Sequence, residues 1–360
     1  MLYREAGQFK TGYAADQAIF PILQDRIGMM LILAVAYVVI PLVANEYWLS
    51  TILVPFLVFS LAALGLNILT GYAGQVSLGT GGFMAVGAFA AYKLATAFPD
   101  LNVIIVFLLA GLIAAAVGIL FGIPSLRIKG FYLAVATLAA QFFLIWLFNR
   151  VPWFRNYSPS GVISAPPRAV FGEVFVTGPE AQPVAKYLFV LTIVALLALA
   201  AKNMVRTSTG RAWMAIRDFD IAAEIIGIRP LRTKLIAFAT SSFYVGIAGA
   251  LWAFIYTASV EPLAFDIDRS FQILFMIIIG GLGSILGSFL GAAFIVLLPI
   301  FLINLPGMLG LGITVATVTN LQFIVSGALI VFFLIVEPNG LARLWQIGKE
   351  KLRLWPFPHG

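Results

Sequence analysis

The chain has 360 residues, of which 62% are hydrophobic and 10% are charged. Soluble domains contain about 45–50% apolar and about 25% charged residues, so this composition excludes a soluble globular protein and predicts an integral membrane protein whose apolar surfaces face lipid. The formal net charge of +7 is typical of membrane topology and contact with anionic lipid, and we expect no nucleic-acid partner.

Residues 1–26 are polar and of mixed charge, without the early apolar segment of a secretory signal, so we expect a cytoplasmic N-terminal tail. Apolar runs near 20 residues long, enough to cross a bilayer, recur over residues 27–336 and define one transmembrane domain. Residues 337–360 are expected to form a cytoplasmic C-terminal tail. The predicted fold class is all-α, a polytopic bundle of about ten helices. The runs begin near Ile27, Trp48, Gly81, Leu101, Gly130, Val184, Lys234, Ser270, Gly283 and Thr319.

The run from Ser270 to Leu305 is too long for one helix, and four glycines interrupt it. We therefore divide it into two helices near Gly283. Five spans then precede residues 150–183 and five follow them. Because each half has an odd number of spans, the second half enters the membrane from the opposite side. This arrangement permits an inverted repeat of five plus five spans.

Two loops are long enough to have a function of their own. Residues 150–183 form an outside loop rich in proline, where long helices are not expected. Residues 202–234 form the main cytoplasmic loop and contain seven basic residues. With the N-terminus inside, sixteen Lys and Arg residues lie in cytoplasmic segments and four (Arg150, Arg155, Arg168 and Arg269) lie outside. This asymmetry places both termini in the cytoplasm.

No machinery for powering transport or for catalysis is visible. The sequence has no Gly-x-x-x-x-Gly-Lys-Ser/Thr phosphate loop for ATP and no cysteine, and its one histidine, His359, is next to last. The spans also lack the ionisable groups of a proton- or sodium-coupled carrier. Lys93 comes nearest to membrane depth, at an outer helix end from which it can reach the interface.

A glycine-rich segment, residues 71–83, lies between the second and third spans. One interpretation is a broken or re-entrant element that faces a translocation path, because irregular backbone at membrane depth needs protein or water around it. The other is close helix packing through small residues. Most polar residues within spans are expected to form helix–helix hydrogen bonds. The candidate residues of the translocation path are Gly71, Gly74, Gln75, Ser77, Thr137 and Gln141.

The charged loop contains apolar residues at three-to-five-residue spacing, namely Trp213, Ile216, Ile221 and Ile225, which is consistent with a short amphipathic helix. Asp218 and Asp220 equally fit a boundary between two short helices. A charge run is usually a solvated loop, but the apolar stripe requires a partner, either the lipid interface or another protein. We favour a protein.

Five sequence blocks resemble one permease family in the same order. They begin in the glycine-rich segment and end near the C-terminus, and the resemblance runs from about Leu61 to Leu341. The blocks are residues 71–79 (GYAGQVSLG), 126–138 (LRIKGFYLAVATL), 210–227 (GRAWMAIRDFDIAAEIIG), 280–292 (GGLGSILGSFLGA) and 337–341 (EPNGL). On these blocks the chain resembles the LivM branch of the LivH/LivM permeases, the membrane subunits of branched-chain amino-acid ABC importers.

The resemblance implies a non-catalytic, multi-pass subunit of the bacterial inner membrane that forms half of a pore and binds no cofactor itself. Its implied partners are a LivH-like second permease, two cytoplasmic ATPase subunits that bind the ATP, and a periplasmic substrate-binding protein. Residues 221–227 are similar to the EAA loop that docks into the ATPases. The residues carried over for ATPase coupling are Arg211, Arg217, Glu224 and Gly227.

Two departures from the family pattern bear on function. Thr80-Gly81-Gly82 stands where family members often have a histidine and small residues, and the docking segment reads Ala-Ala-Glu rather than Glu-Ala-Ala. The first leaves the substrate open among leucine-like amino acids, aromatic compounds, urea and amides, and the second leaves the docking contacts open. The alternative function is a stand-alone channel or ion-coupled secondary carrier for a small polar solute.

Overall fold

The chain is helical almost throughout. The computed structural model describes residues 11–12, 23–125, 132–170, 175–178, 180–308, 321, 324–325, 327–329, 331–333, 335 and 339–354. Across these residues the only sheet is one pair of two-residue strands, which confirms the predicted all-α class. Most of the expected N-terminal tail, the expected span from Thr319 and the last residues with His359 lie outside the described part.

The helices include four π-helical turns, η1 to η4, that continue α-helices, and one 3-10 turn, η5. In chain order they are α2 (Leu23–Ala34), η1 (Val35–Val39), α3 (Ile40–Val43), η2 (Tyr47–Leu53), α4 (Val54–Asn67), η3 (Ile68–Tyr72), α5 (Thr80–Ala97), α6 (Val103–Ser125), α7 (Tyr132–Arg150), α8 (Pro183–Arg206), α9 (Ser208–Asp218), α10 (Asp220–Ile225), α11 (Pro230–Leu251), η4 (Trp252–Tyr256), η5 (Pro262–Phe265), α12 (Ile267–Gly280), α13 (Ile285–Met308) and α15 (Gly340–Leu354).

Within the described residues, seven helical segments are long and apolar enough to cross a membrane, and each begins close to a predicted start. They are Asp25–Val43, Tyr47–Tyr72, Val103–Pro124, Leu133–Arg150, Pro183–Arg206, Pro230–Tyr256 and Ile285–Asn304. The expected spans from Gly81 and Ser270 are present as the helices α5 and α12. However, α12 has 14 residues and α5 has 18, including a lysine. The count of about ten spans therefore stays a prediction.

Helix α11 forms the centre of the bundle and packs against α4, α5 and α6. Its contact with α5 is close because both helices have glycine at the crossing. A Cβ atom at Gly87 would collide with the backbone of Gly246, and one at Gly249 would collide with the backbone of Met84. Small residues at such crossings let backbones approach and gain dispersion energy, which lipid cannot replace.

The two halves of the bundle repeat one order of elements. In the first, α4 and η3 are followed by an irregular segment (73–79), the helix α5 and the long helix α6. In the second, α11 and η4 are followed by an irregular segment (257–266), the short helix α12 and the long helix α13. Helices α4 and α11 run antiparallel, since Phe59 contacts Trp252 while Gly65 contacts Tyr244. This order agrees with the arrangement that an inverted repeat requires.

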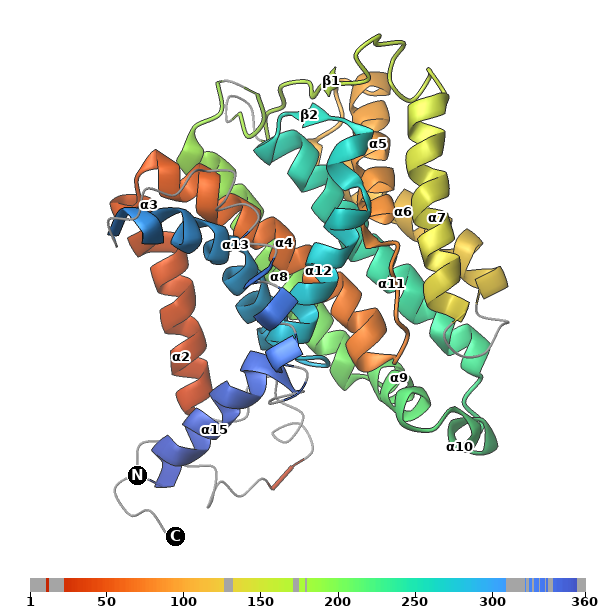
Figure 1. The fold of residues 1–360 in the computed structure, drawn as a ribbon, viewed down its shortest axis with the longest axis vertical. Helices are drawn as coiled ribbons and strands as arrows, with labels where there is room; N and C mark the ends of the chain where they lie inside the picture. The colour runs from red at the N-terminus through yellow and green to blue at the C-terminus, as the bar shows by residue number, and fades with distance from the viewer. Residues whose placement is uncertain are drawn as a thin grey trace.

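The two ends of the bundle carry different segments (Figure 1). Helices α9, α10 and α15 lie at one end, where Lys349 of α15 pairs with Asp25 of α2 at 3.1 Å. The opposite end carries the loop 150–183, whose described residues between α7 and α8 contain no helix, as its prolines predict. This loop contributes strand β1 (Ile163–Ser164), which pairs antiparallel with β2 (Ser259–Val260).

Candidate functional site

The glycine-rich segment interrupts the helices inside the bundle. Residues 73–79 are irregular and connect η3 to α5, with Gln75 and Ser77 buried. Several of their backbone groups are bonded within the protein, whereas the side-chain amide of Gln75 has no hydrogen-bond partner among the described residues. The Gln75 N–H donates to the Leu69 carbonyl at 3.0 Å, and the Leu78 N–H donates to Thr137 Oγ1 at 3.0 Å. The helices are interrupted here, and Gly71 and Gly79 also pack closely, so features of both interpretations are present. The protein surroundings explain how an irregular backbone is tolerated, and a position on a translocation path stays a prediction.

Gln141 of α7 connects the N-termini of α5 and α12. Its Nε2 donates to the Phe265 carbonyl at 2.7 Å, and its Oε1 accepts hydrogen bonds from Ser270 Oγ at 3.1 Å and from the Gly82 N–H. Gln141 lies at the middle of α7, so both short helices begin well inside the bundle. Thr137 and Gln141, two candidates for the translocation path, are buried in this conformation and bonded to the protein.

A second break, residues 281–284, separates α12 from α13, which confirms the predicted division near Gly283. Asn67 of α4 holds this break. Its Nδ2 donates to the Ser284 carbonyl at 2.8 Å and to Ser288 Oγ at 2.9 Å, and its Oδ1 accepts from the Gly283 N–H at 2.8 Å. Gly71 packs so tightly here that a Cβ would collide with the backbone nitrogen of Gly283. The end of the second span is therefore in direct contact with the break between α12 and α13.

Arg217 of α9 reaches from the charged loop into this contact. Its Nη1 donates to the Gly71 carbonyl at 2.9 Å, and its Nε donates to Asp218 at 2.9 Å. Both Gly74 and Gly283 lie close to Arg217. A Cβ atom added at Gly74 would lie 2.8 Å from Arg217 Cγ, and one added at Gly283 would lie 3.4 Å from Arg217 Nη1. Of the four residues carried over for coupling, Arg217 thus contacts the bundle.

The charged loop folds as two short helices, α9 and α10, which meet at Phe219. This is the two-helix alternative, and the expectation of one helix with a single apolar face is wrong. Trp213 and Ile216 are buried against their own chain, and Trp213 Nε1 donates to the Thr233 carbonyl at 3.2 Å. Ile221 and Ile225 point away from it. The stripe divides because the extended backbone of Phe219 changes the direction of the chain.

Four large apolar side chains project from α10 and its flanks. Phe219, Ile221, Ile225 and Ile226 are 76%, 66%, 81% and 74% exposed, and we call them the apolar docking surface. Exposed apolar patches of this kind mark binding sites. The other three residues carried over for coupling are also exposed: Glu224 and Gly227 adjoin the surface in the sequence, and Arg211 lies on α9. Gly227 has a φ of +93° and ends α10 with open space around it.

Arg269 was expected in an outside segment, just before the span that begins near Ser270, and its side of the membrane stays a prediction. It lies in the first turn of α12, which Asp266 caps by accepting from the Asp268 and Arg269 N–H groups. Its guanidinium lies 4.5 Å from the ring centre of Trp252 and 5.0 Å from that of Phe59. The signal for this helix start was an Asp followed by a run of apolar residues at helical spacing.

Comparison with known proteins agrees with this architecture. Residues 48–334 match the family described as branched-chain amino acid transport system / permease component. The LivM permease proteins of a high-affinity branched-chain amino acid transport system from Salmonella typhimurium and Escherichia coli are each 32% identical over 259 residues, which cover 67% of this chain and 60% of the relative. The matched region thus spans less than two thirds of these relatives' length.

A more distant relative is named for another substrate. The fructose import permease protein FruG of Bifidobacterium longum is 25% identical over 297 residues, covering 79% of this chain and 83% of that protein. No solved structure matches the chain. The family match covers most of the sequence, including the irregular segments 73–79 and 281–284 and the two helices α9 and α10. The chain belongs to the family of branched-chain amino acid transport system permease components.

Proposed function

We propose that this chain is a membrane permease subunit of an ABC importer for branched-chain or other hydrophobic amino acids. It forms half of the translocation pore and performs no covalent chemistry. The observation that carries the proposal is the hydrogen bond from Arg217 to Gly71, because it connects an exposed docking surface to the breaks in the transmembrane helices. The family match and the names of the LivM relatives support the substrate class.

The partners in this proposal are a second, LivH-like permease, two cytoplasmic ATPase subunits and a periplasmic substrate-binding protein. The apolar docking surface supports an ATPase contact, since a protein partner would bury the exposed side chains of Ile225 and Phe219 at this end of the bundle. ATP binds to these partner subunits, in agreement with the lack of a phosphate loop in the sequence.

The mechanism follows from the contact between Gly71, near the end of the second span, and Gly283, in the break between α12 and α13. When ATP closes the ATPases, α9 and α10 move with them, and Arg217 transmits the movement to Gly71 and Gly283. The helices α5 and α12, which begin inside the bundle and are joined by Gln141, then change position together. Such coupling requires two states that ATP and substrate favour to different degrees.

The topology in this proposal has about ten spans in an inverted repeat, with both termini in the cytoplasm. The helices α5 and α12 are the third and eighth spans. Each crosses the membrane together with the irregular segment that precedes it. Helix α15 lies at the same end as α9 and α10, which supports termini on the ATPase side. The positive charge of the loop 202–234 supports a cytoplasmic location for this side.

Reconstitution tests the function. The complete transporter is placed in liposomes, and uptake of radiolabelled leucine is measured with and without ATP. Uptake of fructose is measured in the same way, because the FruG relative is named for that sugar. We expect ATP-dependent leucine uptake that stops when the ATPases are inactivated. Uptake that persists without the ATPases would support a channel or secondary carrier, and ATP-dependent fructose uptake alone would contradict the substrate class.

A further inference from the structure

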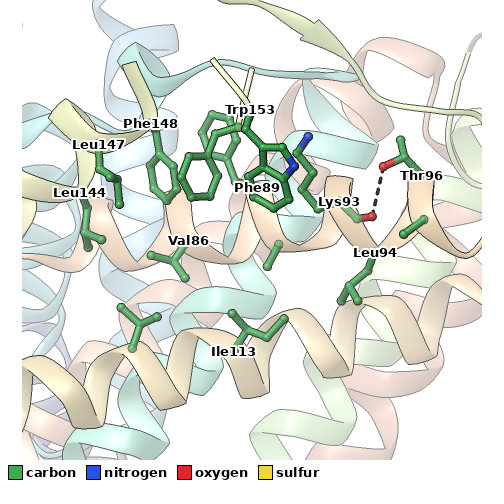
Figure 2. A pocket seen from close by; sticks show the side chains of 14 residues that line it. Val86, Phe89, Lys93, Leu94, Thr96, Ile113, Leu144, Leu147, Phe148 and Trp153 are labelled. Atoms are coloured by element: carbon green, nitrogen blue, oxygen red, sulfur yellow. Dashed lines mark hydrogen bonds between the residues drawn. The ribbon is translucent and has the colours of Figure 1, made fainter. Parts of the chain in front are cut away.

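A cavity of about 600 Å³ lies between α5, α6 and α7, near the end of the bundle that carries the loop 150–183 (Figure 2). This volume falls within the range of about 300–1,000 Å³ that is usual for ligand pockets. Its walls are apolar, with Val86 and Phe89 from α5, Val117 from α6 and Leu144 from α7. The cavity is separate from the two chain breaks and from the apolar docking surface.

Lys93 is the one charged residue among those described that line the cavity. Figure 2 shows Lys93 beside Trp153, and its ammonium lies 4.3 Å from the ring centre of Trp153. The ring centre of Tyr92 is 5.9 Å from the ammonium. In the described part of the chain, no carboxylate pairs with it. A lysine beside tryptophan near a helix end is typical of the level of lipid headgroups, where the ammonium meets phosphate and the ring meets the interface.

The apolar part of the cavity extends from Lys93 toward the middle of the membrane. Val86 lies seven residues before Lys93 on α5, which is about 10 Å along a helix at 1.5 Å per residue. The order of groups along this direction is therefore a cation and an aromatic ring, followed by aliphatic and phenyl side chains. A phospholipid presents the complementary order, with a phosphate followed by an acyl chain.

The mouth of the cavity faces outward from the bundle. Ile113 of α6 and Trp153, both lining residues, are 40% and 52% exposed. Nearby apolar side chains on the outer faces of α6 and α7, such as Leu112 and Trp146, are exposed as well. Such a surface is stable in lipid, so an acyl chain can enter the cavity sideways from the bilayer.

We propose that this cavity binds one acyl chain of an anionic phospholipid, whose phosphate contacts Lys93. A transported amino acid fits less well, because it carries an ammonium as well as a carboxylate and the described lining provides no acidic side chain to receive it. The proposal rests on the membrane location of the chain and is independent of its transport substrate.

Native mass spectrometry of the purified full-length chain tests this proposal, with phosphatidylglycerol and phosphatidylcholine added in separate titrations. Lys93→Gln removes the cation, and Ala90→Trp fills the cavity from α5. Lys186→Gln is the matched control, since Lys186 lies near the same end of the bundle on α8 and does not line the cavity. Monodisperse elution confirms that each variant is folded.

We expect the wild-type chain to retain phosphatidylglycerol more tightly than phosphatidylcholine. Lys93→Gln should weaken phosphatidylglycerol binding about fivefold, the effect of one lysine near an anionic headgroup. Ala90→Trp should remove both lipids, while Lys186→Gln should behave as wild type. Equal loss in both lysine variants, equal retention of the two lipids by wild type, or leucine binding that Ala90→Trp abolishes would overturn the proposal.

Discussion

Arg217 Nη1 and the Gly71 carbonyl oxygen are 2.9 Å apart, although 146 residues separate them in the sequence. Arg217 belongs to α9, in the charged loop, and Gly71 ends the second membrane span. The carbonyl is available because π-helical turns and the irregular segment 73–79 end the regular bonding of the helix there. The contact joins the surface of the chain to its least regular transmembrane backbone.

Replacing Arg217 by Ala should uncouple transport from ATP hydrolysis. The Gly71 carbonyl loses a charge-assisted hydrogen bond, and movement of α9 no longer reaches the breaks. We expect ATP-dependent uptake to fall about tenfold or more, the loss of about 1.4 kcal/mol of coupling, while ATPase activity continues. Arg343→Ala is the matched control, because Arg343 is an exposed arginine of α15 that is not among the coupling residues and its Nη1 donates to Gln346 of its own helix. Parallel loss of ATPase activity in Arg217→Ala would indicate failed assembly instead.

Gly74→Leu should block uptake without preventing membrane insertion. Gly74 has a φ of +68°, which a leucine rarely adopts, and its Cβ would press on Arg217. Transport in liposomes is measured beside Gly28→Leu, at an exposed glycine of α2 with open space around it. Normal uptake by Gly74→Leu would show that the segment 73–79 does not need its present conformation.

Ile225→Asp should prevent association with the ATPases. The side chain is 81% exposed on the apolar docking surface, so the change should leave the stability of the isolated chain unaltered. Co-purification of the ATPase subunits measures the association, and Glu224→Ala and Gly227→Val are expected to weaken this association as well. Leu344→Asp, at an exposed leucine of α15 on the same end of the bundle, is the control. Full association of Ile225→Asp would place the ATPase contact elsewhere.

Asn67→Leu should lower the thermal stability of the chain. It leaves the Gly283 N–H without its partner and removes the donor to Ser284 and Ser288. An unsatisfied buried group costs about 1–3 kcal/mol, which corresponds to a decrease of several degrees in the Tm measured in detergent. Asn304→Leu should change little, because that exposed side chain donates only to the Ile300 carbonyl of its own helix. Equal Tm values for the two variants would contradict this role of Asn67.

Much of the architecture was predictable because hydropathy and glycine act locally. The seven membrane-spanning segments, the break near Gly283, the irregular segment after Gly71 and the helix-free proline loop all follow from residues within a few turns of one another. The contacts of Arg269 with Trp252 and Phe59 could not be predicted, since an Asp before an apolar run marks a helix start but does not indicate which side chains its first turn meets.

The sequence by itself therefore determined the class of the protein, the approximate positions of its spans, and the loop that carries its exposed apolar surface. Only the tertiary structure decided which polar residues meet. Gln141 lies beside Phe265, Asn67 beside Ser284, and Arg217 beside Gly71, across separations of 124 to 217 residues. Such contacts depend on how helices cross, and crossing is set by the packing of small residues such as Gly87 and Gly246, which no local pattern specifies.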